Sequence, residues 1–112
     1  MPPTSPPKGT RAQTVYTLVV ELGRVKGDGL PEKATGGGMV LYAPGRDEEE
    51  AVRDAVRLLK EAGLNPLEVT ANGSIEEQEA EGAVIAPEER ALMEQALAEN
   101  GVVVASKEAF YD

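Results

Sequence analysis

The sequence has no cysteine and no histidine among its 112 residues, and only 4% of its residues are aromatic. Without cysteine there are no disulfides and no thiol nucleophiles, and without histidine the commonest proton-transfer group and zinc ligand is missing. No apolar run approaches the roughly 18 residues that a membrane-spanning helix needs. No hydrophobic region typical of a secretory signal is found, so we expect a cytoplasmic protein with no membrane partner.

Basic side chains are also few. The 11 lysines and arginines are outnumbered by 20 acidic residues, which gives a net charge of −9. Such a surface repels phosphates, so we expect no direct binding to nucleic acid. The charge is uneven: residues 1–46 carry six basic and three acidic side chains (+3), whereas residues 47–112 carry five and seventeen (−12).

Proline is concentrated at the start of the chain, where residues 1–13 hold four of the eight prolines and almost no apolar side chain. Such a segment has little to offset the entropy lost on ordering. We therefore predict a disordered Pro-rich tail over residues 1–13 and a single domain over residues 14–112. The hydrophobic content of 41% is enough for one core, and the length is too short for two domains.

The first half of the predicted domain contains two strands. Residues 14–25 have apolar side chains at every second position, which is typical of a strand with one buried face. Residues 26–38 are rich in glycine and carry no hydrophobic period, so we expect a long mobile loop. A second strand over residues 39–43 completes an antiparallel hairpin.

The clearest helix begins after Asp47, with Glu50 three residues later at capping-box spacing, and ends at Gly63. Apolar residues recur through it at helical spacing, which predicts one packing face. Alternation over residues 67–71 predicts a short strand after this helix.

The remaining elements are shorter. Ser74 has the spacing to cap one or two helical turns, and residues 83–86 fit either an edge strand or a loop, so the state of residues 75–86 stays open. Pro87 suits the first position of a second long helix. Residues 102–105 are continuously apolar, which favours a strand covered on both faces or lying in the centre of the sheet.

The predicted order is β-β-α-β-(short α)-α-β, an α+β fold. Two long helices on one face of a mixed or antiparallel sheet give a two-layer α/β sandwich of ferredoxin-like character. The sheet face left open is of the kind that small domains use to dimerise, so we expect a homodimer.

The strongest functional signal is a run of eight glutamates between residues 75 and 99, with Arg90 as the only basic residue. Such a surface can steer a basic protein toward itself, although glutamates also keep solvated helices soluble. We therefore expect a non-enzymatic interaction or regulatory protein, an adaptor, inhibitor or immunity-type protein, that binds a basic protein partner. The partner-binding residues would be Glu76, Glu77, Glu79, Glu81, Glu88 and Glu89.

The alternative is a dimeric small-molecule-binding module. Arg24, Lys26 and Lys33 gather around the glycine-rich loop of residues 26–38 in an otherwise acidic chain, and an anionic ligand could bind to them there and on the sheet face. The glycines precede a strand rather than a helix, so the loop does not have the pattern of a phosphate-binding loop.

An enzyme is the class that the residues favour least. No serine has a histidine to activate it, and the glutamates lie in amphipathic or polar segments where we expect them to be hydrated. No segment has the spacing of a calcium-binding loop. We therefore expect no catalytic residues, no metal and no cofactor.

Overall fold

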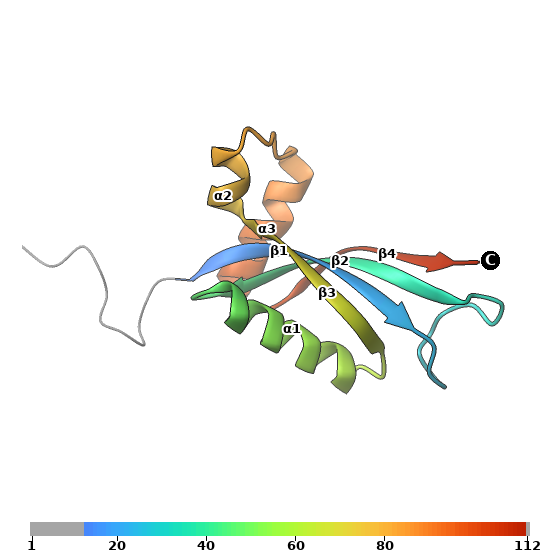
Figure 1. Cartoon of the computed structure of the whole chain (residues 1–112). Coiled ribbons are helices and arrows are strands. Elements are labelled where there is room, and N and C mark those ends of the chain that lie inside the picture. The colour runs from blue at the N-terminus through green and yellow to red at the C-terminus, as the bar shows by residue number, and fades with distance from the viewer. Residues whose placement is uncertain (1–12, 112) are drawn as a thin grey trace, which may run out of the picture.

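The computed structural model describes residues 13–111, so all of the predicted tail except Gln13 lies outside the described residues. The fold is α+β, with a four-stranded antiparallel sheet and three helices (Figure 1). The elements follow the predicted order: β1 (Thr14–Gly23), β2 (Gly36–Gly45), α1 (Glu48–Glu61), β3 (Asn65–Ser74), α2 (Ile75–Ala80), α3 (Pro87–Glu99) and β4 (Val103–Phe110).

The β1–β2 hairpin forms the centre of the sheet, whose strand order is β3-β1-β2-β4. Each neighbouring pair is antiparallel, and the hairpin register places Leu18 opposite Leu41. β3 pairs with the outer side of β1, and β4 pairs with the outer side of β2. Both late strands are therefore edge strands.

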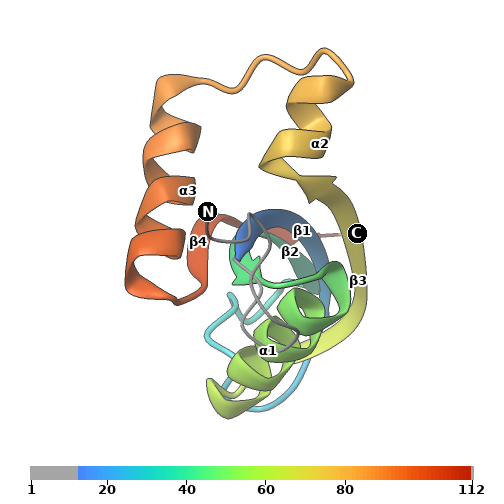
Figure 2. The same ribbon diagram turned by 90° about the vertical axis from the view of Figure 1, so that its left-hand side faces the viewer.

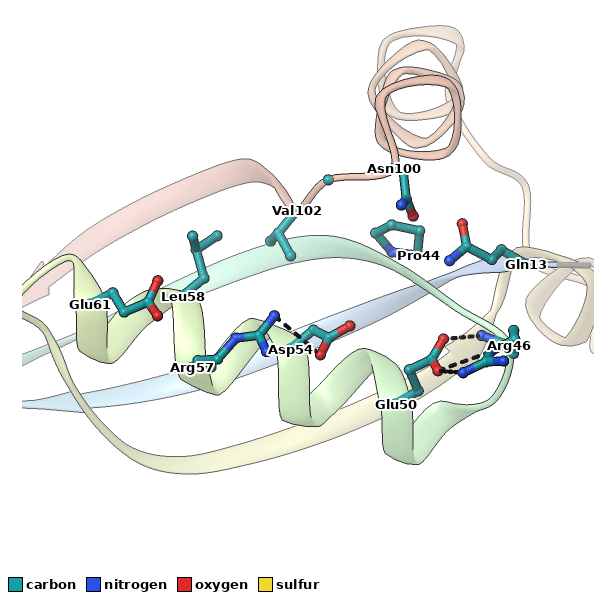
Figure 3. Close-up of a pocket in the computed structure, with 11 residues that line it drawn as sticks. Gln13, Pro44, Arg46, Glu50, Asp54, Arg57, Leu58, Glu61, Asn100 and Val102 are labelled. Carbon is teal, nitrogen blue, oxygen red and sulfur yellow. Dashed lines mark hydrogen bonds and ion pairs between the residues drawn. The ribbon is translucent and has the colours of Figure 1, made fainter. Parts of the chain in front are cut away.

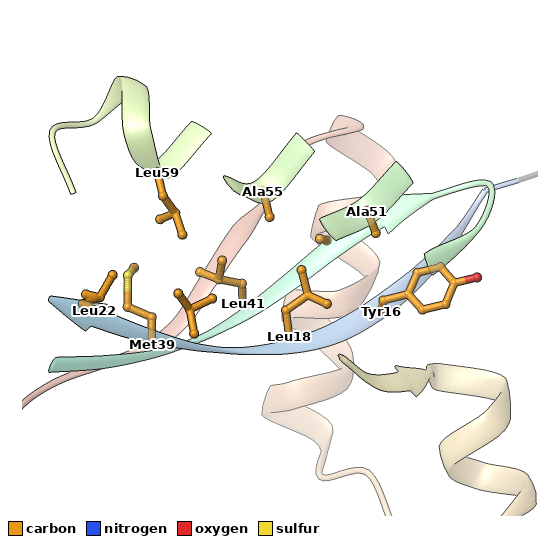
Figure 4. Packing of buried hydrophobic residues seen from close by; sticks show 10 residues of the cluster. Tyr16, Leu18, Leu22, Met39, Leu41, Ala51, Ala55 and Leu59 are labelled. Atoms are coloured by element: carbon orange, nitrogen blue, oxygen red, sulfur yellow. The ribbon is translucent and has the colours of Figure 1, made fainter. Parts of the chain in front are cut away.

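One side of the sheet, the α1 face, holds the larger core. Its central side chains are Leu18 and Val20 of β1 and Leu41 of β2, all fully buried. Ala51 and Ala55 of α1 pack directly on them, because small side chains let the helix approach the sheet closely (Figure 4). The prediction that α1 has one packing face is confirmed.

The opposite side, the α3 face, holds a second and smaller cluster. Val15 and Tyr42 point to this side and are covered by Met93 and Ala96 of α3. Figure 1 shows α1 on one side of the sheet, and α2 and α3 on the other. The sheet is thus covered by helices on both faces.

This arrangement does not confirm the two-layer, ferredoxin-like sandwich. The prediction placed both long helices on one face, whereas α1 and α3 belong to different clusters on opposite faces. The strand order β3-β1-β2-β4 also differs from that of ferredoxin-like folds. The reason lies in β2, whose Leu41 and Tyr42 are both buried, so that each face needs its own cover.

The start of the second predicted strand is also corrected. Gly36, Gly37 and Gly38 belong to β2 rather than to the loop before it. A Cβ atom at Gly36 would lie 2.7 Å from the carbonyl oxygen of Leu22, and one at Gly37 would lie 2.7 Å from that of Glu108. The glycines therefore permit close approach of the neighbouring strands rather than mobility.

The last strand is longer than predicted and lies at an edge instead of the centre. β4 continues to Phe110, which packs against Gly38 on the α3 face. The apolar run arises because successive side chains face two helical layers: Val102 packs on the α1-face cluster, and Val103 packs on the α3-face cluster.

Candidate functional site

The Glu-rich segment forms a distinct unit on the α3 face. Ser74 caps α2 as predicted: its Oγ accepts from the Glu77 amide at 3.1 Å, and the Glu77 carboxylate accepts from the Ser74 amide at 2.9 Å. Pro87 stands at the first turn of α3. Residues 83–86 are neither helix nor strand, so they form a loop between the two helices.

α2 and α3 lie beside each other above the sheet without packing together (Figure 2). A cleft of about 150 Å³ lies between them, over the beginning of β1. Its apolar residues are Val15, Ile75, Met93 and Leu97, and its charged residues are Glu76, Arg90 and Glu94. This cleft is the feature that brings the acidic helices and an apolar surface to one place.

Three of the predicted partner-binding glutamates hold α2 in position. The Glu76 carboxylate accepts a hydrogen bond from Thr14 Oγ1 at the beginning of β1. Glu77 completes the capping box, and Glu79 forms an ion pair with Arg90 that joins α2 to α3. These side chains already have partners within the chain, so they contribute structure as well as charge.

The other three predicted glutamates differ from one another. Glu89 accepts hydrogen bonds from the Ala86 amide at 3.1 Å and from the Tyr42 hydroxyl at 3.4 Å. Burial, together with the nearby Glu89 carboxylate, raises the pKa of Tyr42 above its usual value of 10.0. Glu81 and Glu88 are exposed, and neither carboxylate has a hydrogen-bond or ion-pair partner within residues 13–111.

The loop that carries Arg24, Lys26 and Lys33 is held together from within. Arg24 Nε donates to Asp28 Oδ2 at 2.9 Å, and the Arg24 guanidinium also donates to the carbonyl oxygens of Pro31 and Ala34. Arg24 thus organises the loop instead of presenting a free cation to a ligand. The predicted loop lies over residues 24–35, between β1 and β2, and hydrogen bonds from Arg24 and to Asp28 hold it from within.

Asp28 is the residue at this loop that sequence reasoning missed. Its carboxylate is buried, at 5% exposure, and accepts from the amides of Val25 and Leu30, each at 3.0 Å. The pKa of Asp28 is lowered from 3.8 to about 2 by hydrogen bonds. The largest contribution comes from the Val25 amide, followed by the Arg24 guanidinium and the Leu30 amide. The opposite charges of Arg24 and Asp28, four residues apart, were a signal in the sequence that could have indicated this ion pair. Lys26 and Lys33 stay exposed, so the small-molecule alternative now depends on these two lysines.

A second hollow, which we call the α1 groove, was not predicted. It has a volume of about 440 Å³ and lies between α1 and the connection from α3 to β4 (Figure 3). One wall carries charged side chains of α1 and Arg46, and the other includes Asn100 and Val102. Sequence periodicity cannot reveal a groove whose two walls come from residues distant in the sequence.

Among the residues lining the α1 groove, the Arg46–Glu50 ion pair, at 2.5 Å, is shorter than the Arg57–Asp54 pair, at 3.6 Å, and lies at the beginning of α1. Arg46 Nη2 lies 2.5 Å from Glu50 Oε2, and the Arg46 amide donates to Glu50 Oε1 at 3.0 Å. The Arg46 side chain and then its amide lower the pKa of Glu50 from 4.5 to about 2. The expected cap is half confirmed, because Asp47 accepts from the Glu50 amide at 2.8 Å while the Glu50 carboxylate turns to Arg46.

Comparison with known proteins gives a family but no activity. A family model described as Domain of unknown function (DUF8846) matches residues 15–111. No curated protein and no solved structure matches the chain. Within the described residues, no helix is long and apolar enough to cross a membrane, and no group of three or more acidic side chains is arranged to hold a metal ion.

Proposed function

Because the chain belongs to the DUF8846 family, whose description states no activity, we propose a function from its own surface: the cleft between α2 and α3 binds a basic protein partner. The partner would present an amphipathic segment with both cationic and apolar side chains. The domain would act as a non-enzymatic interaction protein. The single observation that carries this proposal is an apolar cleft set between two acidic helices.

The apolar part of the proposed site extends beyond the cleft. Leu97 is 44% exposed at its edge, although it belongs to a core helix. Val84, in the loop that joins α2 to α3, is 94% exposed and is the most exposed of the large apolar side chains in the part of the chain that the structure describes. Exposed apolar side chains on an acidic surface favour a protein partner over a small ion, because burying them stabilises a complex.

The charge of the site supports a basic partner. The segment from α2 to the end of α3 carries eight glutamates and one arginine, a net −7. Glu81 and Glu88 have no partner among the described residues, and Glu94 lines the cleft. Carboxylates of this kind accelerate association with a cationic surface and make the affinity depend on salt.

The first test uses a fluorescent amphipathic peptide of lysine and leucine as a probe, titrated with the protein at rising salt. The variant of the proposed site, called the cleft variant, carries Glu94→Gln in the cleft, with Glu81→Gln and Glu88→Gln at the ends of α2 and α3 that the connecting loop joins. The matched control carries Glu32→Gln, Glu48→Gln and Glu49→Gln, which removes the same charge from exposed positions elsewhere. We expect the cleft variant to lose about tenfold in affinity, and the control to lose far less.

A second measurement separates the apolar contribution. Leu97→Ala should weaken the probe at low and at high salt alike, because this substitution removes contact area and no charge. The same variants then serve in pull-downs from host lysate, where a true partner is lost with the cleft variant and kept with the control. Equal losses in the two triple variants, or an affinity that does not change with salt, would contradict the proposal.

A further inference from the structure

The α1 face is covered incompletely. α1 packs on β3, β1 and β2, whereas no Cα atom of α1 lies within 8 Å of a Cα atom of β4. On the side of α1 toward β4, Leu58 of α1 is 45% exposed and Val104 of β4 is 50% exposed, and Val102 lines the α1 groove together with Leu58. Val104 pairs with Leu41, so its side chain is on the α1 face. We call Leu58, Val102 and Val104 the open strip.

The charged side chains beside the open strip include one cation and one anion that could pair with those of a second copy of the chain. Arg57 and Glu61 lie one turn apart on α1, and both line the groove next to Leu58 (Figure 3). Arg57 is 68% exposed, and its contact with Asp54 is loose, at 3.6 Å. Along α1, the cation comes before the apolar residue and the anion comes after it. An identical helix that runs in the opposite direction therefore places its anion opposite this cation.

We propose that the open strip binds a second copy of this chain, with the two α1 helices antiparallel about a two-fold axis near Leu58. Arg57 of each copy would then face Glu61 of the other, which gives two equivalent ion pairs around a centre of Leu58 and Val104. An isologous interface needs one self-complementary patch, and the open strip together with Arg57 and Glu61 supplies one. This inference is independent of the proposed partner-binding cleft, which lies on the opposite face.

The charge distribution favours a second copy here rather than elsewhere. Two chains of net charge −9 repel each other, so contact between them is favoured where cations accompany the carboxylates. The α2–α3 segment has one arginine against eight glutamates and would repel its own copy. The α1 groove instead has Arg46 and Arg57 against Glu50, Asp54 and Glu61.

The test is the oligomeric state of the full chain, measured by sedimentation velocity from about 1 μM to about 1 mM. The intact protein should dimerise in this range. Arg57→Glu and Glu61→Arg should each raise the dimer dissociation constant by about tenfold or more, because each places like charges opposite one another twice. Both positions are exposed, and circular dichroism should show that both variants keep the fold.

An equimolar mixture of the two variants gives the sharpest result. Arg57→Glu leaves glutamate at both positions, and Glu61→Arg leaves arginine at both, so a mixed pair has two attractive contacts again. The mixture should therefore form heterodimers at concentrations where each variant alone stays largely monomeric. A mixture that stays monomeric overturns the proposed antiparallel pairing, and an intact protein that stays monomeric up to about 1 mM overturns the dimer.

A control substitution tests the opposite face. Phe110→Glu places a charge on the exposed part of the α3 face, where Phe110 is 44% exposed. It should leave the dimer intact, whereas Leu58→Glu should abolish it. The reverse pattern would place the interface on the α3 face and overturn the proposal.

Discussion

Arg24 Nε lies 2.9 Å from Asp28 Oδ2, and this ion pair closes the loop between the two central strands from within. The cation and the anion are one helical turn apart in sequence but lie in a loop, where amides rather than helical geometry hold the carboxylate. A loop rich in glycine can thus be ordered by one buried carboxylate.

Asp28→Asn should lower stability at neutral pH and flatten its dependence on acid. The folded pKa of about 2 lies below the ordinary 3.8, so the ionised group stabilises the fold fully above about pH 3.8 and loses this effect as the pH falls toward 2. Urea unfolding of the intact protein should show a loss of stability across that window, and Asp28→Asn should show a smaller one. Glu32→Gln, in the same loop, is the matched control. An unchanged pH profile for Asp28→Asn would contradict the prediction.

Gly37→Ala should destabilise the protein by about 1–3 kcal/mol, because its Cβ would meet the carbonyl oxygen of Glu108, which belongs to the backbone. Gly38→Ala should cost less, since its nearest neighbour is the ring of Phe110, and a side chain can move. Gly101→Ala, where the nearest atom lies at an ordinary 3.8 Å, serves as the control. Thermal unfolding should rank the three variants in this order, and equal shifts would disprove the steric explanation.

Ala55→Leu should destabilise the protein by about 1–3 kcal/mol or more, because α1 lies against the sheet at this fully buried alanine. A larger side chain would push the helix away from Leu18 and Leu41. Ala62→Leu, at the exposed end of the same helix, should leave stability nearly unchanged. Chemical unfolding of both variants measures the difference.

Glu89→Gln should lower the pKa of Tyr42 without returning it to 10.0. Burial is the larger cause of the raised pKa, and the Glu89 carboxylate is the smaller one. The measurement is an ultraviolet titration in a background with Tyr16→Phe and Tyr111→Phe, so that only one phenol is observed. A value that does not fall would show that the 3.4 Å contact is absent in solution.

Local patterns predicted the elements well because their causes are local. The caps at Asp47 and Ser74, the proline at the start of α3 and the alternation in β1 each depend on neighbours within a few residues. The face that each helix covers has a different cause. It depends on which strand each connection reaches, and the apolar alternation of β2 is equally consistent with one cover or two.

The candidate site likewise has features that the sequence shows directly and features that depend on the three-dimensional arrangement. The acidic composition of α2 and α3 could be read directly, but the cleft between them requires that the two helices do not pack together. Arg24 looked like a free cation because a sequence does not show whether a guanidinium turns inward. The open strip depends on the edge position of β4, which its apolar run concealed.

The order of the strands has a consequence for the chain as it is being made. The outer edge of β2 stays without a partner until β4 has been synthesised, since Gly36 pairs with Phe110. An exposed strand edge invites pairing with other nascent chains. Three consecutive glycines make this edge a poor template for foreign strands. The glycines at the start of this edge, of which Gly37 lets β4 approach closely at the end of folding, would therefore also be the part of the edge that attracts a foreign strand least.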